Sequence, residues 1–241
     1  WELPFQAAPP LTQILFYGGL NHMYRGIIFD LDGTLLDTSE GVLSSVRHTI
    51  KTMGYRELPE ETLLTFIGPP VKRSLMEHYG LDDAEADRAT AVFRDQYKNV
   101  DLLKARPYDG ILPLLERLKS RGFLIGVATL KREDYALTIL EHFGIAERCD
   151  LICGSDFASK MQKTDVLDKC LKGLNLSPAE AVLIGDTASD GSGAKCSGTD
   201  FIAVTYGFGP SDPDGWKEFE PVFIAGKPAD IGMFLGLAPE I

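Results

Sequence analysis

Short runs of β-branched and apolar residues alternate along this chain with amphipathic stretches of helix length. The runs are 25–29, 123–128, 150–153, 181–184 and 201–204, and the stretches between several of them are 110–120, 132–143, 164–173 and 188–196. Strands that alternate with helices of this length are typical of βαβ units, in which helices cover both faces of a parallel sheet. The chain is therefore predicted to have an α/β fold, with its ligands at the carboxyl ends of the strands.

The alternation stops between residues 37 and 106, where the pattern indicates helices alone. We expect helices at 39–53, 59–66, 71–79 and 84–97, separated by breaks at Gly54, 68–70 and Gly80. A helical segment of this length after the first strand indicates a second, smaller domain. We predict a core formed by 23–37 and 106–241 and a helical domain at 38–105. Residues 1–22 are predicted to be an N-terminal extension, either added for expression or an upstream segment, rather than a functional arm.

The charge and the cysteines narrow the classes of partner and compartment. The 241 residues include 24 Lys and Arg and 35 Asp and Glu, which give a net charge of −11. Nucleic acids and anionic membranes both require clustered positive charge, so neither is an expected partner. No apolar run approaches the ~20 residues of a membrane span. The four cysteines form no CxxC pair, which favours reduced thiols and a cytoplasmic location.

Two acidic pairs follow predicted strands. Asp30 and Asp32 come after the first strand at a spacing that points both side chains to one face, and Gly33 permits a sharp turn. For this pair alone, a functional site and an ordinary Asp-Gly turn are equally good interpretations. Asp186 ends a later strand, and Asp190 lies one helical turn further on, where it could instead cap a helix.

Together, the two acidic clusters favour a divalent cation. Two carboxylates as close as those of Asp30 and Asp32 repel each other unless a cation or a proton separates them, and a second acidic cluster at a strand end of the same sheet favours the cation. Oxygen ligands suit Mg²⁺ better than Zn²⁺, and no His or Cys set has the spacing of a zinc site.

Two further residues, taken singly, are better explained by structure than by function. Thr129 follows a strand, where its hydroxyl and the backbone N–H of Leu130 could bind a phosphate oxygen, or the hydroxyl could bond the backbone. Lys163 opens a helix, a position that the helix dipole disfavours for a cation, so it suggests an anionic neighbour. Taken alone, Lys163 is better explained as a solvated surface charge, and Lys160 could be the true partner of the anion.

The ordered set of motifs closely resembles the haloacid dehalogenase (HAD) superfamily. The resemblance rests on Asp-x-Asp-Gly-Thr at 30–34, on Thr129 and Lys163, and on Gly-Asp-x-x-x-Asp at 185–190, and it covers residues 24 to about 210. It implies a Rossmann-like three-layer core with a parallel sheet. It also implies that the helical segment 38–105 is a mobile cap inserted after the first strand.

The resemblance also implies roles for the site residues. Asp30 would be the nucleophile that forms an aspartyl-phosphate, and Asp32 would be the general acid and base. Mg²⁺ would be held by Asp30, the backbone carbonyl of Asp32, Asp186 and Asp190. The transferring phosphoryl group would be bound by Gly33, Thr129, Leu130 and Lys163. Leu130 departs from the small or polar residue usual after the threonine, so substrate selectivity is expected to differ.

Within the superfamily, the sequence resembles phosphatases more than other branches. Dehalogenases lack a carboxylate at the position of Asp32, and sugar-phosphate mutases carry a His and an Arg where this chain has Val42 and Val71. The segments 66–70 and 205–209 resemble bacterial phosphoglycolate phosphatase-like proteins. We therefore expect a Mg²⁺-dependent phosphatase, monomeric or homodimeric, that hydrolyses a small phosphorylated metabolite.

Two alternatives remain open. A nucleotidase or pyrophosphatase of the same superfamily is compatible with the cap sequence. A non-catalytic phosphate-binding regulatory protein is less favoured, because a degenerate relative would be expected to lose Asp30 or Asp32. In the cap, Lys72 and Arg73 could meet an anionic substrate or form part of a solvated helix face.

Overall fold

Six parallel strands form the central sheet of the computed structural model, which describes residues 24–157 and 160–238. The predicted extension at 1–22 lies outside the described residues. The strand order is β5-β4-β1-β6-β7-β8, with β1 (Gly26–Phe29), β4 (Leu124–Arg132), β5 (Leu151–Ser155), β6 (Ala181–Gly185), β7 (Asp200–Val204) and β8 (Phe223–Ala225). Phe29 of β1 pairs with Val127 of β4 and Ile184 of β6, so the ends of β1 and β6 lie side by side next to the middle of β4.

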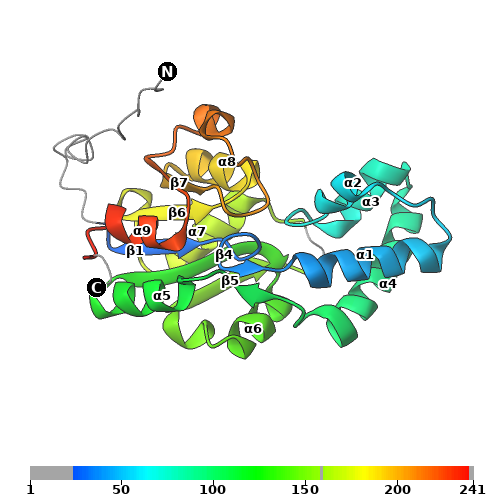
Figure 1. The fold of residues 1–241 in the computed structure, drawn as a ribbon, viewed down its shortest axis with the longest axis horizontal. Helices are drawn as coiled ribbons and strands as arrows, with labels where there is room; N and C mark the ends of the chain where they lie inside the picture. Colours follow the sequence, from blue (N-terminus) through cyan, green and yellow to red (C-terminus); the bar gives the residue numbers. More distant parts are fainter. Residues whose placement is uncertain (1–23, 158–159, 239–241) are drawn as a thin grey trace, which may run out of the picture.

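Helices cover both faces of this sheet, which confirms the predicted three-layer α/β core. Ile27 and Phe29 of β1 belong to one apolar cluster with residues of α5 (Ile111–Ser120), α6 (Glu133–His142) and α9 (Pro228–Phe234). Ile28 points the other way and joins residues of α7 (Lys163–Gly173) and α8 (Ala188–Ser197). Figure 1 shows α5 and α6 below the sheet and α8 above it. Because β1 contributes to both clusters, all four of its residues are buried.

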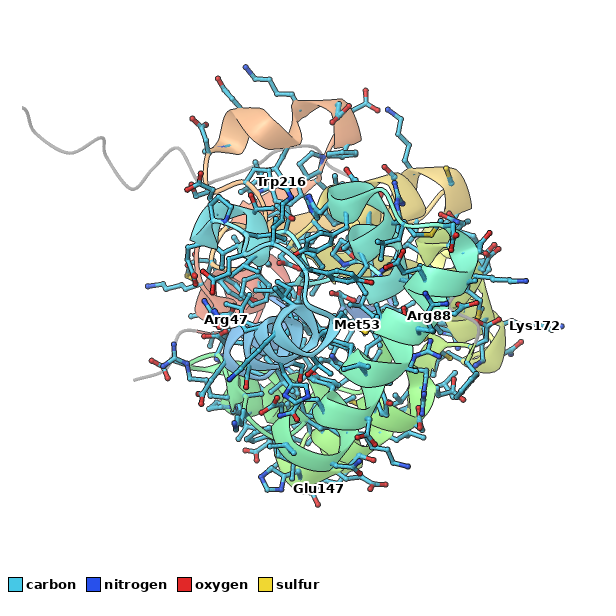
Figure 2. All side chains as sticks on the ribbon, turned by 90° about the vertical axis from the view of Figure 1, so that its right-hand side faces the viewer. Arg47, Met53, Arg88, Glu147, Lys172 and Trp216 are labelled. Carbon is cyan, nitrogen blue, oxygen red and sulfur yellow. The ribbon has the colours of Figure 1, made fainter. Side chains whose placement is uncertain are left out.

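A helical insertion separates β1 from β4. It runs from α1 (Ser39–Met53) through α2 (Glu60–Leu64), α3 (Val71–Tyr79) and α4 (Asp83–Gln96) to a π-helical turn, η2 (Tyr97–Asp101). At its two ends, β2 (Leu36–Asp37) and β3 (Arg106–Pro107) pair as antiparallel strands. The insertion lies to one side of the core in Figure 1. Figure 2 views the molecule from that side, with Arg47 of α1 and Arg88 of α4 in front of the core.

The structure differs from the predicted elements mainly in short segments. The β2–β3 pair, β8 and α9 were not predicted, because two- and three-residue strands and a seven-residue helix carry too little periodicity to be recognised. The 3₁₀ turns were also not predicted; they are η3 (Ala146–Arg148), η4 (Pro178–Glu180) and η5 (Pro213–Phe219). The largest change is in β4, which continues to Arg132 instead of ending at Ala128, with a register shift against β5 between these two residues.

The helices and the cysteines of the described residues bear on the expected absence of a membrane span and on the expected reduced thiols. In 24–157 and 160–238, none of the helices combines the length and the apolarity needed to cross a membrane. All four cysteines are free.

Candidate active site

The two predicted acidic pairs meet at the carboxyl edge of the sheet. Asp30 follows β1 and Asp186 follows β6, and the backbone N–H of Asp30 donates to the carbonyl of Ile184 at 2.8 Å, which joins the two strand ends. Asp190 lies in the first turn of α8. One carboxylate oxygen of each of these three aspartates lies within 4.8 Å of the other two, and all three residues are buried. The structure therefore brings Asp30 together with both members of the second acidic pair, and Asp32 is not part of this group.

The buried carboxylates are short of positive charge. The pKa of Asp30 is raised to about 7, because burial, which has the largest effect, and the charges of Asp190 and Asp32 outweigh the opposing charge of Lys163. The pKa of Asp186 is raised well above its usual value by burial and by the charges of Asp190 and Asp30. A raised carboxyl pKa means that the surroundings do not stabilise the ionised form. Three buried carboxylate oxygens at this separation therefore fit a hard divalent cation, which prefers oxygen ligands.

Lys163 lies between two of the carboxylates. Its Nζ is 2.6 Å from Oδ1 of Asp30 and 2.6 Å from Oδ1 of Asp190, and the residue is only 4% exposed. Burial by itself would lower the pKa of Lys163, but the two carboxylates raise it overall, so the side chain is a cation. The interpretation of Lys163 as a solvated charge is therefore wrong. Lys160, the alternative partner, is exposed.

Asp190 has both of the roles that its position suggested. Oδ2 accepts from the backbone N–H of Thr187 at 2.9 Å and from its hydroxyl at 2.6 Å, which caps α8. Oδ1 of the same carboxylate binds Lys163. The helix cap thus fixes the orientation of a carboxylate that also belongs to the site.

Gly33 and a distant loop hold Asp186. Oδ2 of Asp186 accepts from the backbone N–H of Phe208 at 2.8 Å, and the hydroxyl of Thr34 donates to Oδ1 at 3.3 Å. Gly33 has φ +83°, and a Cβ at this position would lie 2.0 Å from Oδ2 of Asp186. Gly33 therefore supplies space for Asp186 in addition to the predicted turn. Phe208 lies in the segment 205–209 that follows β7, and although that segment carries a family resemblance, no local pattern predicts its contact with Asp186.

Asp32 binds a lysine that the sequence interpretation missed. Nζ of Lys131 lies 2.9 Å from Oδ1 of Asp32, and the hydroxyl of Thr38 donates to the same oxygen at 2.6 Å. Lys131 is in the part of β4 beyond the predicted strand end. In a strand extended past Ala128, Lys131 and Thr129 lie on the same face, because side chains alternate between the two faces of a strand. This alternation is the sequence signal that could have identified Lys131 as a site residue.

Thr129 and Leu130 lie where a phosphoryl group could bind. The Thr129 side chain is buried, and its hydroxyl accepts the backbone N–H of Lys131 at 3.1 Å, which leaves the hydroxyl hydrogen free to donate. Both residues line a cavity of about 230 Å³. The core also contributes Asp30, Asp32, Lys163 and 187–190 to its walls, and the helical insertion contributes 68–70 and Arg73.

Comparisons with known proteins agree with this geometry. A model of the haloacid dehalogenase-like hydrolases matches residues 27–204. A 5′-nucleotidase of Pseudomonas aeruginosa is 36% identical over 190 residues, which are 78% of this chain and 86% of that protein. A phosphoglycolate phosphatase of Aquifex aeolicus is 33% identical over 185 residues, covering 76% of this chain and 86% of that protein.

One further relative is named as a kinase and not as a phosphatase, and a solved structure shows the same fold. The tyrosine-protein kinase PtkA of Mycobacterium tuberculosis is 39% identical over 188 residues, which are 77% of this chain but 64% of that protein. The crystal structure of a predicted phosphatase from Clostridium acetobutylicum superposes with a TM-score of 0.83 at 35% identity, covering 88% of this chain and 98% of that chain. The chain therefore belongs to the haloacid dehalogenase-like hydrolase family and is an enzyme with phosphatases among its relatives.

Proposed function

We propose that this enzyme is a Mg²⁺-dependent phosphatase that hydrolyses a small phosphomonoester through an aspartyl-phosphate on Asp30. The observation that carries the proposal is the arrangement around Asp30. Asp30 lines a cavity, and its carboxylate lies beside Lys163 and two further carboxylates, with a second aspartate two residues along the chain. This set provides a nucleophile, a proton donor, a cation for the phosphoryl oxygens and a site for a metal ion.

The residues of the chain can carry both halves of the reaction. The Asp30 carboxylate attacks phosphorus and forms an aspartyl-phosphate, while Asp32 protonates the leaving oxygen as its bond to phosphorus breaks. Asp32 then takes a proton from water as the water oxygen attacks phosphorus, which releases inorganic phosphate and restores Asp30. Lys163, Thr129 and the backbone N–H of Leu130 bind the phosphoryl oxygens throughout.

The charges of the site explain the proposed need for Mg²⁺. The carboxylates of Asp30, Asp32, Asp186 and Asp190 carry four negative charges when ionised, and the ammonium groups of Lys131 and Lys163 balance two of them. Asp30, Asp186 and Asp190, with the backbone carbonyl of Asp32, would hold the ion. When bound, Mg²⁺ neutralises the remaining charge and draws electron density from the phosphoryl oxygens, so that an anionic substrate can approach.

We further propose that residues 38–105 act as a cap over this site. The antiparallel pair of β2 and β3 forms the base of the insertion, and its loop at 68–70 lies in the wall of the cavity beside Asp32. Gly68 approaches the core closely enough for a Cβ there to lie 3.8 Å from Cγ2 of Thr187. A cap of this kind excludes water and selects the leaving group. A cavity of about 230 Å³ favours a small ester of the phosphoglycolate type.

Arg73 is the cap residue that we expect to bind a second anionic group of the substrate. It lines the cavity and forms no ion pair with any residue in the described ranges, whereas Lys72 is held by Asp83 at 3.0 Å and Asp87 at 2.7 Å. Arg73→Ala should raise KM for a carboxylated phosphomonoester roughly tenfold, because a charge-assisted hydrogen bond is lost, with little change in kcat. Steady-state kinetics with phosphoglycolate and with an uncharged alkyl phosphate check this.

The control for Arg73 is its neighbour on the same helix. Lys72→Ala should leave KM for both substrates within about twofold of the original enzyme, because its charge is already bound within the cap. An Arg73→Ala variant with unchanged KM for the carboxylated substrate would contradict the assignment.

A substrate panel with and without Mg²⁺ tests the proposed function. Phosphoglycolate, sugar phosphates, nucleotides and pyrophosphate are incubated with the enzyme, and released phosphate is measured. We expect release from a small phosphomonoester that falls by about a thousandfold or more with a chelator and returns when Mg²⁺ is added. No release from any compound would contradict the proposal and favour a phosphate-binding regulatory protein.

The same panel addresses the alternative substrates. A clear preference for pyrophosphate would establish the pyrophosphatase alternative. A clear preference for nucleotides would establish the nucleotidase alternative, which the name of the Pseudomonas aeruginosa relative favours. A cytoplasmic location and a monomeric or homodimeric state remain predictions, and gel filtration checks the second.

A further inference from the structure

Lys131 is a buried cation shared by the core and the helical insertion. Its side chain is 7% exposed, and its Nζ lies 2.9 Å from Oδ1 of Asp32 and donates to the hydroxyl of Tyr97 at 2.9 Å. The same Nζ is 4.9 Å from the centre of the Tyr97 ring. Burial by itself would lower the pKa of Lys131, but Asp32 and Tyr97 raise it overall, so the group remains an ammonium. A buried ammonium with partners on two domains connects those domains.

The contacts of Asp32 are unequal on its two oxygens. Oδ1 accepts from both Lys131 and the hydroxyl of Thr38, whereas no group in the described ranges donates to Oδ2. Asp32 also lines the cavity that contains Asp30. Two donors on one oxygen fix the plane of the carboxylate, so the other oxygen is left to exchange a proton with the reacting groups.

Tyr97 is fixed on the insertion side. It is 2% exposed, stacks on Phe93 with 5.4 Å between ring centres, and meets the edge of Tyr135 at 5.7 Å. It is also the first residue of the π-helical turn η2, an irregularity that occurs frequently at functional sites. The Tyr97 hydroxyl can reach Lys131 only while the insertion is seated against the core, because the two residues belong to different domains.

We propose that Lys131 is a positioning residue that orients Asp32 for proton transfer, and that Tyr97 fixes Lys131 when the insertion is seated. This inference rests on the proposed function, since it assigns Asp32 the proton. The contact between Lys131 and Tyr97 would orient Asp32 for proton transfer only when the insertion covers the cavity. Neither Lys131 nor Tyr97 needs to touch the substrate to have this effect.

The test uses two leaving groups that differ in their need for a proton. An alkyl phosphate taken from the substrate panel requires protonation as it leaves, whereas p-nitrophenolate leaves without it. Lys131→Met should lower kcat for the alkyl ester about a hundredfold, within the range of a general acid, with KM within about twofold. The pre-steady-state burst of p-nitrophenolate should slow by less than about threefold. Lys131→Arg should recover part of the lost kcat, because it keeps the charge and the donors.

Tyr97→Phe gives an independent measurement, because it removes one hydroxyl and keeps the ring packing. It should lower kcat for the alkyl ester about tenfold with the same difference between leaving groups. Tyr135→Phe is the matched control, since Tyr135 packs on Tyr97 but its hydroxyl makes no hydrogen bond in the described ranges. It should leave both rates unchanged. Thermal unfolding of each variant shows whether the fold is retained.

Three outcomes would contradict either the positioning role of Lys131 or the proposed function. Equal losses on both leaving groups would overturn the positioning role and indicate a structural one. Wild-type rates in both Lys131→Met and Tyr97→Phe would also overturn it, while leaving the phosphatase proposal intact. Absence of phosphate release by the unmodified enzyme would instead overturn the proposed function, on which this inference depends.

Discussion

Asp30→Asn is expected to abolish turnover, with a loss of at least about a thousandfold in kcat, because an amide cannot act as the nucleophile toward phosphorus. The fold should survive the change. Burial, Asp190 and Asp32 raise the pKa of Asp30 to about 7 against the opposing charge of Lys163, so the ionised carboxylate is less favourable in the metal-free protein than in water. Removing that charge should leave the melting temperature without metal equal or higher. Phosphate release and thermal unfolding, each with and without Mg²⁺, measure the two effects.

Asp32→Asn distinguishes the proposed role of Asp32 in proton transfer from the proposed role of Asp30 as nucleophile. It retains the nucleophile but cannot exchange a proton, so p-nitrophenyl phosphate should still phosphorylate the enzyme while hydrolysis of the aspartyl-phosphate slows. Acid-quenched samples with radiolabelled substrate should therefore show more protein-bound phosphate for Asp32→Asn than for the unmodified enzyme, and none for Asp30→Asn. Mg²⁺-dependent turnover by Asp30→Asn near the original rate would refute the mechanism.

The parts of the fold that the sequence predicts are those with strong periodicity. The predicted helices at 39–53 and 71–79 match α1 and α3 at both ends, and the C-terminal end of each is marked by a glycine with φ near +70°. The strands that lead to Asp30 and Asp186 are also in place, because buried parallel strands are continuous apolar runs. The predicted helix at 59–66 shortens to Glu60–Leu64, where two acidic residues in the first turn help to start it but no glycine marks its end.

The parts of the site that the sequence does not predict depend on contacts between residues that are far apart in the sequence. Lys131 reaches Tyr97 across 34 positions, and the backbone of Phe208 reaches Asp186 across 22. Neither contact leaves a local pattern, because each arises only when two separately folded segments pack together. The same packing distinguishes neighbours that look alike in sequence. Lys72 is held by aspartates of α4, while Arg73, one residue further on, lines the cavity.

Gly33→Ala should remove most of the activity, because the added methyl group displaces the carboxylate of Asp186. A Cβ at Gly33 would lie 2.0 Å from Oδ2 of Asp186 and 2.7 Å from Cδ2 of Phe208, so the carboxylate and the loop that binds it must both move. Displacing one of the three carboxylates that we propose to hold Mg²⁺ should lower kcat about a hundredfold or more and raise the Mg²⁺ concentration for half-maximal activity about tenfold. Activity measured across a Mg²⁺ titration checks both effects.

Gly54→Ala is the matched control, because it carries the same backbone cost without the contact. Gly54 has φ +69°, close to the +83° of Gly33, but a Cβ there would have no atom within 4 Å. Each substitution should cost about 1 kcal/mol of stability from the positive φ alone. If the loss at Gly33 were only backbone strain, the two variants would have similar activity and the same Mg²⁺ requirement. A loss confined to Gly33→Ala, together with a shifted Mg²⁺ titration, would show that the space beside Asp186 is what the enzyme requires of this glycine.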